Sequence, residues 1–158
     1  MGVIAINQYM KEGDIIEVSV TEVNPGYILI EYNEKPATLQ VIDLTWKPGR
    51  VNPKDFVSVG DHVKVKVTKV IGEKYSVSLR EALPNGNPWN KPPKIGERFQ
   101  GKVSVVTDYG YFFDITEYCR ALLHKDDATK TYKIGEPEIL IVKSIYIKLR
   151  KVELSVAN

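Results

Sequence analysis

Residues 108–115, "DYGYFFDI", place three aromatic side chains in a row directly after a glycine. Side chains in a β-strand point alternately to opposite faces. Tyr111 and Phe113 therefore share one side, while Phe112 and Asp114 share the other. Because an aspartate is rarely buried in a core, we expect Tyr111 and Phe113 to be core rings and Phe112 to be exposed.

The same alternation recurs along the chain in short segments rich in β-branched residues, separated by Gly, Pro, Asn or Glu-Lys turns. The other expected strands are residues 14–23, 26–32, 37–41, 62–71, 74–81, 97–106, 120–124, 137–147 and 150–156. Each half of the chain thus holds five strands, with room for only a short helical turn. A unit this small avoids exposed sheet edges by closing into a barrel, and the five-stranded OB-fold fits this count.

The two halves are copies of one unit. "KEGDIIEVSV" at 11–20 resembles "KIGERFQGKV" at 94–103, and "VSVGDHVKVKV" at 57–67 resembles "YKIGEPEILIV" at 132–142. Between these anchors, residues 26–40 and 110–124 have the same spacing and begin with a glycine before an apolar run. This repeat predicts two barrels of the same fold.

Residues 82–93, "ALPNGNPWNKPP", contain four of the nine prolines and separate the two copies. Such a segment is typical of a linker. We therefore divide the chain into an N-terminal extension, a first barrel, a linker and a second barrel, at residues 1–10, 11–81, 82–93 and 94–158.

Composition limits the classes of function. The 158 residues are 43% hydrophobic and 27% charged, as in a soluble folded protein, and no apolar run is long enough to cross a membrane. The single cysteine, Cys119, suits a reducing compartment, so we expect a cytoplasmic protein. The sequence shows no nucleophile motif, phosphate-binding glycine loop or metal cluster. This predicts a non-catalytic protein with no cofactor, metal site or small-molecule substrate.

Several motifs together are typical of a known family. They are "VTDYGYFFDI" at 106–115, "LLH" at 122–124, Gly-Asp or Gly-Glu before the fourth strand, the endings "SVSL" and "VELS", "DLTWKPGRVNPKDFVSVGD" at 43–61 and "GNPW" at 86–89. In order and spacing they resemble the S-one (S1) RNA-binding domain, a module repeated in a ribosomal protein of the small subunit. The resemblance covers nearly the whole chain from Lys11. It implies an OB-fold, so we expect an all-β protein of two tandem five-stranded OB-fold barrels joined by a Pro-rich linker.

The resemblance also implies a binding site in the second copy. In this family, bases stack on an aromatic residue before the strand-two glycine, a second aromatic two residues after it, and a histidine that ends strand three. The residues at these positions are Tyr109, Phe112 and His124. A basic residue at the start of strand five contacts the phosphate chain in the family, and Lys151 lies there beside Arg150.

The outward position of Phe112 supports this site on physical grounds. An exposed ring beside Tyr109 forms a stacking platform, and base–aromatic stacking contributes roughly 1–3 kcal/mol per base. The alternative is that Phe112 is covered by a neighbouring loop or by the other copy. We expect Lys102 to contribute to the same RNA-binding set.

The first copy lacks the stacking residues. Aligned from its glycine, its equivalents are Pro25, Ile28 and Gln40, and the outward Ile28 and Ile30 predict an apolar protein contact. A basic, aromatic loop with Trp46 and Arg50 offers a phosphate contact, the alternative being a solvated loop that Trp46 holds in place.

Charge also favours the second copy. Residues 11–81 carry ten basic and eleven acidic side chains, whereas residues 94–158 carry eleven and nine. A total net charge of +2 is too small for binding by electrostatics alone, so stacking must contribute much of the affinity. Unpaired bases offer their faces for stacking and duplex grooves do not.

Two functions follow. The first is a ribosome-associated protein of translation that binds single-stranded RNA, with messenger RNA as a candidate, mainly through the second barrel. The second is an adaptor that docks on the small ribosomal subunit or another RNA-processing machine through Ile28, Ile30 and the apolar "GVIAI" at residues 2–6.

Overall fold

The computed structural model describes residues 10–157, and their regular structure consists of β-strands and 3-10 turns of three residues each. The chain divides into two compact units between Asn87 and Pro88. This boundary lies within the proline-rich segment 82–93. Within the described range, no helix has the length and apolar character needed to span a membrane. The apolar residues 2–6 lie outside the described range.

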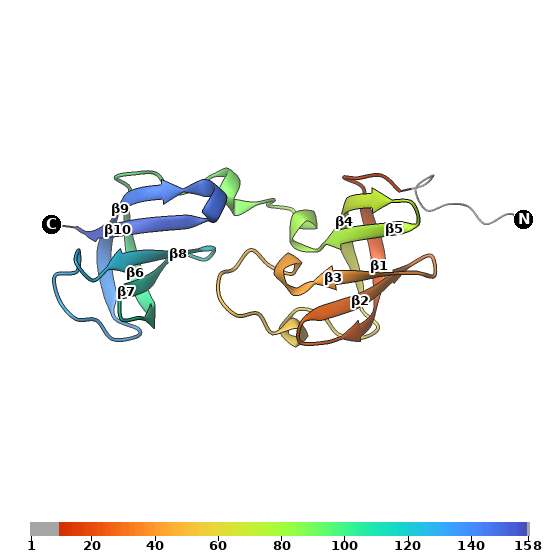
Figure 1. Ribbon diagram of the computed structural model, residues 1–158, viewed down its shortest axis with the longest axis horizontal. Helices are drawn as coiled ribbons and strands as arrows, with labels where there is room; N and C mark the ends of the chain where they lie inside the picture. Colours follow the sequence, from red (N-terminus) through yellow and green to blue (C-terminus); the bar gives the residue numbers. More distant parts are fainter. Residues whose placement is uncertain (1–9, 158) are drawn as a thin grey trace, which may run out of the picture. The chain divides into compact units, whose positions relative to one another are not determined.

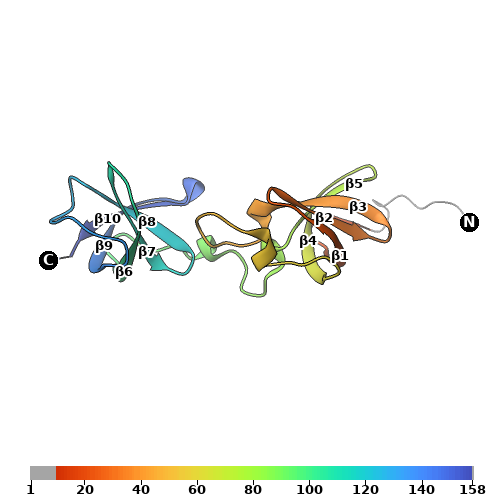
Figure 2. The same ribbon diagram turned by 90° about the horizontal axis from the view of Figure 1, so that it is seen from below.

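The first unit is a five-stranded sheet curled around its own core, as Figures 1 and 2 show. Its strands are β1 (Ile15–Val23), β2 (Tyr27–Tyr32), β3 (Lys35–Gln40), β4 (His62–Ile71) and β5 (Lys74–Ser78). They are ordered β3-β2-β1-β4-β5, and β3 and β5 lie close to each other where the sheet curls round. There the Tyr75 hydroxyl donates a hydrogen bond to the Lys35 carbonyl at 2.7 Å. Desolvation by burial raises the pKa of Tyr75 to about 12, so this hydroxyl remains a donor at neutral pH.

The second unit is a closed barrel. Its strands are β6 (Arg98–Val106), β7 (Gly110–Thr116), β8 (Cys119–His124), β9 (Pro137–Tyr146) and β10 (Lys151–Val156). Their order is β10-β8-β7-β6-β9, with β9 and β10 also paired. Closure comes from a parallel pairing of β10 with β8, in which Glu153 lies opposite Leu122 and Leu154 opposite Leu123. The predicted fold of two five-stranded OB-type barrels is confirmed.

Alternation along each strand fills the two cores. In β7, Phe113 is fully buried, Tyr111 packs against the core at its edge, and Phe112 lies on the other face. Tyr132 packs edge-on against Phe113, with ring centroids 5.3 Å apart. Trp89 also packs against this core, so the end of the proline-rich segment is part of the second unit rather than a free linker.

Four turns of one design introduce β1, β4, β6 and β9. They are residues 11–14, 58–61, 94–97 and 133–136, each with a glycine at φ between 87° and 95° and an acidic residue after it. In each turn the acidic side chain accepts a hydrogen bond from the backbone N–H three residues earlier, at 2.8–3.0 Å. The glycine N–H and the acidic residue's C=O then bond to the neighbouring strand. The conserved spacing of the two sequence copies thus reflects a shared turn geometry.

Replacing Gly96 by alanine tests this turn design. A Cβ at Gly96 would meet no atom within 4 Å, so the only penalty is the left-handed φ of 87°. We expect the free energy of unfolding of the second barrel to fall by about 1–2 kcal/mol, measured by urea denaturation. Gly26 is the matched control, because it also has open space and lacks a positive φ. Equal effects of Gly96→Ala and Gly26→Ala would contradict the turn explanation.

Candidate nucleic-acid interface

A groove on the outer surface of the second barrel brings together most of the site residues predicted there. It encloses about 330 Å³ between β7, β8 and the β9–β10 hairpin. Its lining residues are Tyr109, Phe112, Arg120, Leu122, Leu149, Arg150, Lys151 and Val152. Two aromatic, three aliphatic and three basic residues therefore share one concave site, and Leu149 is the exposed member of the aliphatic three.

Tyr109 and Phe112 form the aromatic part of the groove. Their rings meet edge to face, with centroids 6.1 Å apart and planes at 89°. Tyr109 is 46% exposed and Phe112 is half-buried. The outer faces of two rings in this arrangement offer a base an apolar stacking surface.

The turn before β7 fixes the position of Tyr109. Gly110 N–H donates to the Thr107 hydroxyl oxygen at 3.1 Å, and the Tyr109 carbonyl accepts from Lys125 N–H at 3.0 Å. A Cβ at Gly110 would lie 2.5 Å from the Leu123 carbonyl oxygen. Glycine is thus needed here for the close approach of β7 to β8, which holds Tyr109 beside Phe112.

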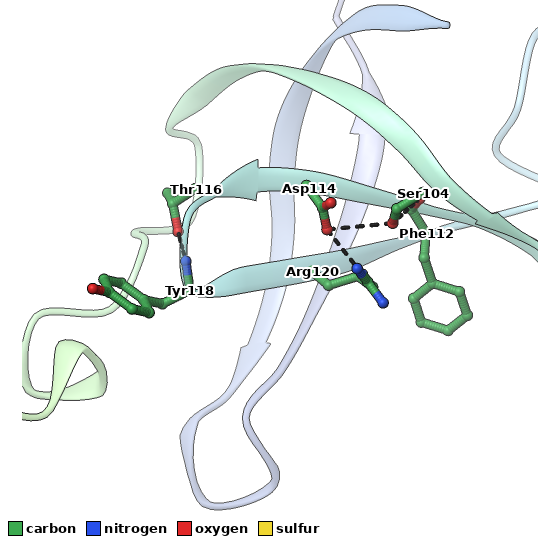
Figure 3. A network of polar contacts seen from close by, with 6 residues as sticks. All are labelled: Ser104, Phe112, Asp114, Thr116, Tyr118 and Arg120. Carbon is green, nitrogen blue, oxygen red and sulfur yellow. Dashed lines mark hydrogen bonds and ion pairs between the residues drawn. The ribbon is translucent and has the colours of Figure 1, made fainter. Parts of the chain in front are cut away.

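A polar network lies next to Phe112 on the same face (Figure 3). The Arg120 Nε donates to the Asp114 carboxylate at 2.8 Å, and the Ser104 hydroxyl lies within hydrogen-bond distance of the same carboxylate oxygen and of the Phe112 carbonyl. Asp114 lies opposite Arg120 in the strand register, as Phe112 lies opposite Leu122. The ion pair fixes the position of the Arg120 guanidinium, which lines the groove.

His124 and Lys102 lie near the groove but do not line it. His124 is opposite Gly110 in the register, and its Nδ1 accepts a hydrogen bond from Asp126 N–H at 3.3 Å. The Asp126 carboxylate also lies 3.4 Å from this Nδ1, so Asp126 holds the orientation of the imidazole ring. Lys102 is exposed on β6 opposite Asp114.

Arg150 and Lys151 line the groove where β10 begins, which is the strand position that the sequence predicted for them. Arg150 is exposed and adopts a left-handed conformation at φ 51°, directly before β10. The Lys151 ammonium lies 5.8 Å from the centroid of the Tyr146 ring.

Sequence alignment of the two copies from their glycines was wrong by one residue in β2. The Thr21 hydroxyl donates to the Leu29 carbonyl, as the Ser104 hydroxyl donates to the Phe112 carbonyl. The equivalents of Tyr109, Phe112 and His124 are therefore Gly26, Leu29 and Gln40. The second copy has one extra residue at the β7–β8 bulge, between Asp114 and Thr116. This residue compensates for the one-residue shift in β2, so residues 26–40 and 110–124 still have equal lengths.

Ile28 and Ile30 are consequently not on the surface. Both are fully buried in the core of the first barrel, and Ile30 pairs with Val20 as Phe113 pairs with Val103. The prediction of an apolar protein contact through these residues was wrong, because the one-residue shift exchanges the two faces of a strand.

Trp46 also differs from its predicted role as an RNA contact. It is only 4% exposed, its Nε1 donates to the Arg80 carbonyl at 3.0 Å, and the Arg80 guanidinium lies 4.0 Å from its ring centroid. A ring covered in this way cannot stack on a base, so Trp46 holds the loop in place. Arg50 is exposed and borders a depression together with Lys54.

The first barrel has a groove of mixed polar and apolar lining at the place of the aromatic one. Strand registers align Thr38 with Leu122, Lys74 with Lys151 and Ser76 with Glu153. The groove encloses about 720 Å³, and Thr38, Lys74 and Ser76 line it together with apolar residues such as Ile71 and Tyr75. It keeps a lysine at the position of Lys151 and has no ring at the positions of Tyr109 and Phe112.

Comparison with known proteins gives a family for part of the chain. Residues 9–80 match the model of the S1 RNA binding domain. The small ribosomal subunit protein bS1 of Rhodopseudomonas palustris is 28% identical over 152 residues, covering 93% of this chain and 26% of that protein. The bS1 protein of Neisseria meningitidis serogroup B is 29% identical over 141 residues, covering 87% and 25%. This chain thus spans about a quarter of the length of these curated relatives.

Among solved structures, the chain is similar to GSP13 from Bacillus subtilis. The two are 27% identical with a TM-score of 0.42, and the match covers 54% of this chain and 65% of that one.

Four groove residues were missed by sequence reasoning, namely Arg120, Leu122, Leu149 and Val152. Arg120, Leu122 and His124 share one parity on β8, so alternation from His124 would have found the first two. Leu149 lies in a hairpin tip, where alternation gives no prediction.

Proposed function

Through residues 9–80 this chain belongs to the S1 RNA-binding domain family, and we propose that it is a non-catalytic protein that binds single-stranded RNA mainly through its second barrel. The observation that carries the proposal is the groove of that barrel, which combines Tyr109 and Phe112 with Arg120, Arg150 and Lys151. Single-strand recognition has two components. Aromatic rings stack on the faces of the bases, and flanking cations bind the phosphates.

Unpaired RNA fits this groove better than a duplex. A base can lie on the rings only when its face is exposed, and base pairs in a helix keep their faces covered by stacking. Tyr109, Phe112 and His124 are the proposed base contacts, while Arg150, Lys151 and Lys102 are the proposed phosphate contacts. In the first barrel, Arg50 and the groove beside Lys74 offer weaker phosphate contacts.

The names of the curated relatives support a role in translation. They are small ribosomal subunit proteins, which supports the small subunit as the assembly on which this chain acts. Messenger RNA, which offers unpaired bases to the rings, is the ligand that we propose. Adaptor function through Ile28 and Ile30 loses its basis, since both side chains are buried.

Titration with unstructured RNA and with a duplex of equal length tests the proposal. We expect clear binding to the single strand and much weaker binding to the duplex. If three cations contact phosphates, log K should fall with log salt concentration with a slope of about −2, since single strands give roughly −0.7 per contact. Equal affinity for the single strand and the duplex would contradict binding through this groove. A much steeper dependence of log K on log salt concentration, as for a protein with many phosphate contacts, would also contradict it.

A further inference from the structure

The hairpin between β9 and β10 is longer than its counterpart in the first barrel. In the first barrel, only Gly72 and Glu73 separate the last strand pair. In the second, residues 147–150 lie between the last pair, Tyr146 and Lys151. The second barrel thus carries two extra residues at this tip, beside its groove.

The extra residues expose apolar side chains in a defined backbone conformation. Ile147 is exposed, and Leu149 is 75% exposed. A 3-10 turn over Ile147–Leu149 is closed by the Arg150 N–H, which donates to the Ile147 carbonyl at 3.0 Å. Single exposed apolar residues are common and need no explanation, but Leu149 lines the same groove as Tyr109 and Phe112.

We propose that Leu149 forms the second wall of the base site, so that one unpaired base lies between the rings of Tyr109 and Phe112 and the side chain of Leu149. This inference rests on the proposed function. The groove of about 330 Å³ is near the lower end of the roughly 300–1,000 Å³ that encloses one small ligand. A groove of this size has room for one base.

Covering both faces of a base has a consequence for ligand choice. A base held in this way must leave the stack formed by its neighbours in the strand. Strands whose bases stack weakly lose less on binding, so we expect oligouridylate to bind more tightly than oligoadenylate. Apolar contact with Leu149 offsets part of the lost stacking by removing the second base face from water.

Three variants of Leu149 and a control test this wall against oligouridylate and oligoadenylate of equal length, by fluorescence anisotropy. Leu149→Ala should bind oligouridylate about five- to tenfold more weakly, as expected for losing most of one leucine contact. Leu149→Ser should weaken it at least as much, whereas Leu149→Trp should bind as tightly as the native protein or more tightly. Ile134→Ala is the matched control, since Ile134 is 71% exposed in the loop before β9 and lies outside the groove.

The outcomes separate this inference from the proposed function. If Phe112→Ala weakens binding while Leu149→Ala and Leu149→Ser bind like the native protein, the second wall is wrong and RNA binding by the rings stands. If Phe112→Ala itself has no effect, the proposed function fails. An equal loss in Leu149→Ala and Ile134→Ala, or tighter binding of oligoadenylate by the native protein, would also overturn the inference. Circular dichroism of each variant confirms that the barrels are folded.

Discussion

Replacing Tyr109 and Phe112 together by alanine is expected to weaken binding of unstructured RNA by about thirtyfold or more. Each stacked base contributes roughly 1–3 kcal/mol, and a loss of about 1.4 kcal/mol is tenfold in affinity. The salt dependence of the remaining binding should stay nearly unchanged, because the proposed phosphate contacts Arg150, Lys151 and Lys102 are still present. Titration of labelled RNA at several salt concentrations measures both quantities.

Tyr27→Ala provides the matched control for this double variant. Tyr27 is 43% exposed, close to the 46% of Tyr109, but it belongs to the first barrel at the position equivalent to Gly110. We expect Tyr27→Ala to bind like the native protein. Native affinity in the double variant, with an unchanged circular dichroism spectrum, would show that the rings do not stack on bases.

The fold was predictable because its determinants are local. Each of the ten strands follows from alternation between turn residues, and most predicted strand ends fall within one or two residues of those observed, as for the predicted strand 62–71 and β4. Two copies of one pattern then required two barrels. What alternation could not give is closure, since the parallel pairing of β10 with β8 joins segments that are distant in sequence.

The two faces of β7 were predictable for a similar reason. Asp114 indicated the outward face of the strand, and the outward position of Phe112 followed from it. In the first barrel the same reasoning failed, because the two copies were aligned on their glycines. Glu31, the equivalent of Asp114, would have been the correct reference for the alignment. Gly26 corresponds to Tyr109 and not to Gly110, so every side chain in β2 was assigned to the wrong face.

Trp46 and Leu149 mark the limit of sequence reasoning in loops. The burial of Trp46 depends on Arg80, which lies thirty-four positions later. Leu149 lies in a 3-10 turn that ends at Arg150 in a left-handed conformation. This conformation is uncommon outside glycine, so the sequence does not predict it. No periodic pattern in the sequence predicts either the burial of Trp46 or the exposure of Leu149.

Adjacent rings in β7 should give opposite results when each is replaced alone. Phe113 is fully buried and packs on Tyr132, so Phe113→Ala is expected to lower the free energy of unfolding of the second barrel by about 3–5 kcal/mol, through lost burial and the cavity that remains. That is a large part of the roughly 5–15 kcal/mol that stabilises a typical domain. Phe112→Ala leaves no such cavity, and its cost in stability should be several times smaller.

Urea denaturation followed by tryptophan fluorescence can assign the loss to one barrel. Trp89 packs against the second core, while Trp46 is buried in the first unit, so a Trp46→Phe background isolates the signal of the second barrel. In that background we expect the transition to move to much lower urea for Phe113→Ala and to stay nearly in place for Phe112→Ala. RNA affinity should be affected in the opposite order at low temperature. The Phe113→Ala molecules that remain folded still carry Tyr109 and Phe112 and should bind RNA. Folded Phe112→Ala lacks one groove ring and should bind RNA weakly. Similar stability losses in the two variants would mean that both rings are core, and the stacking surface would then have to lie elsewhere on the barrel.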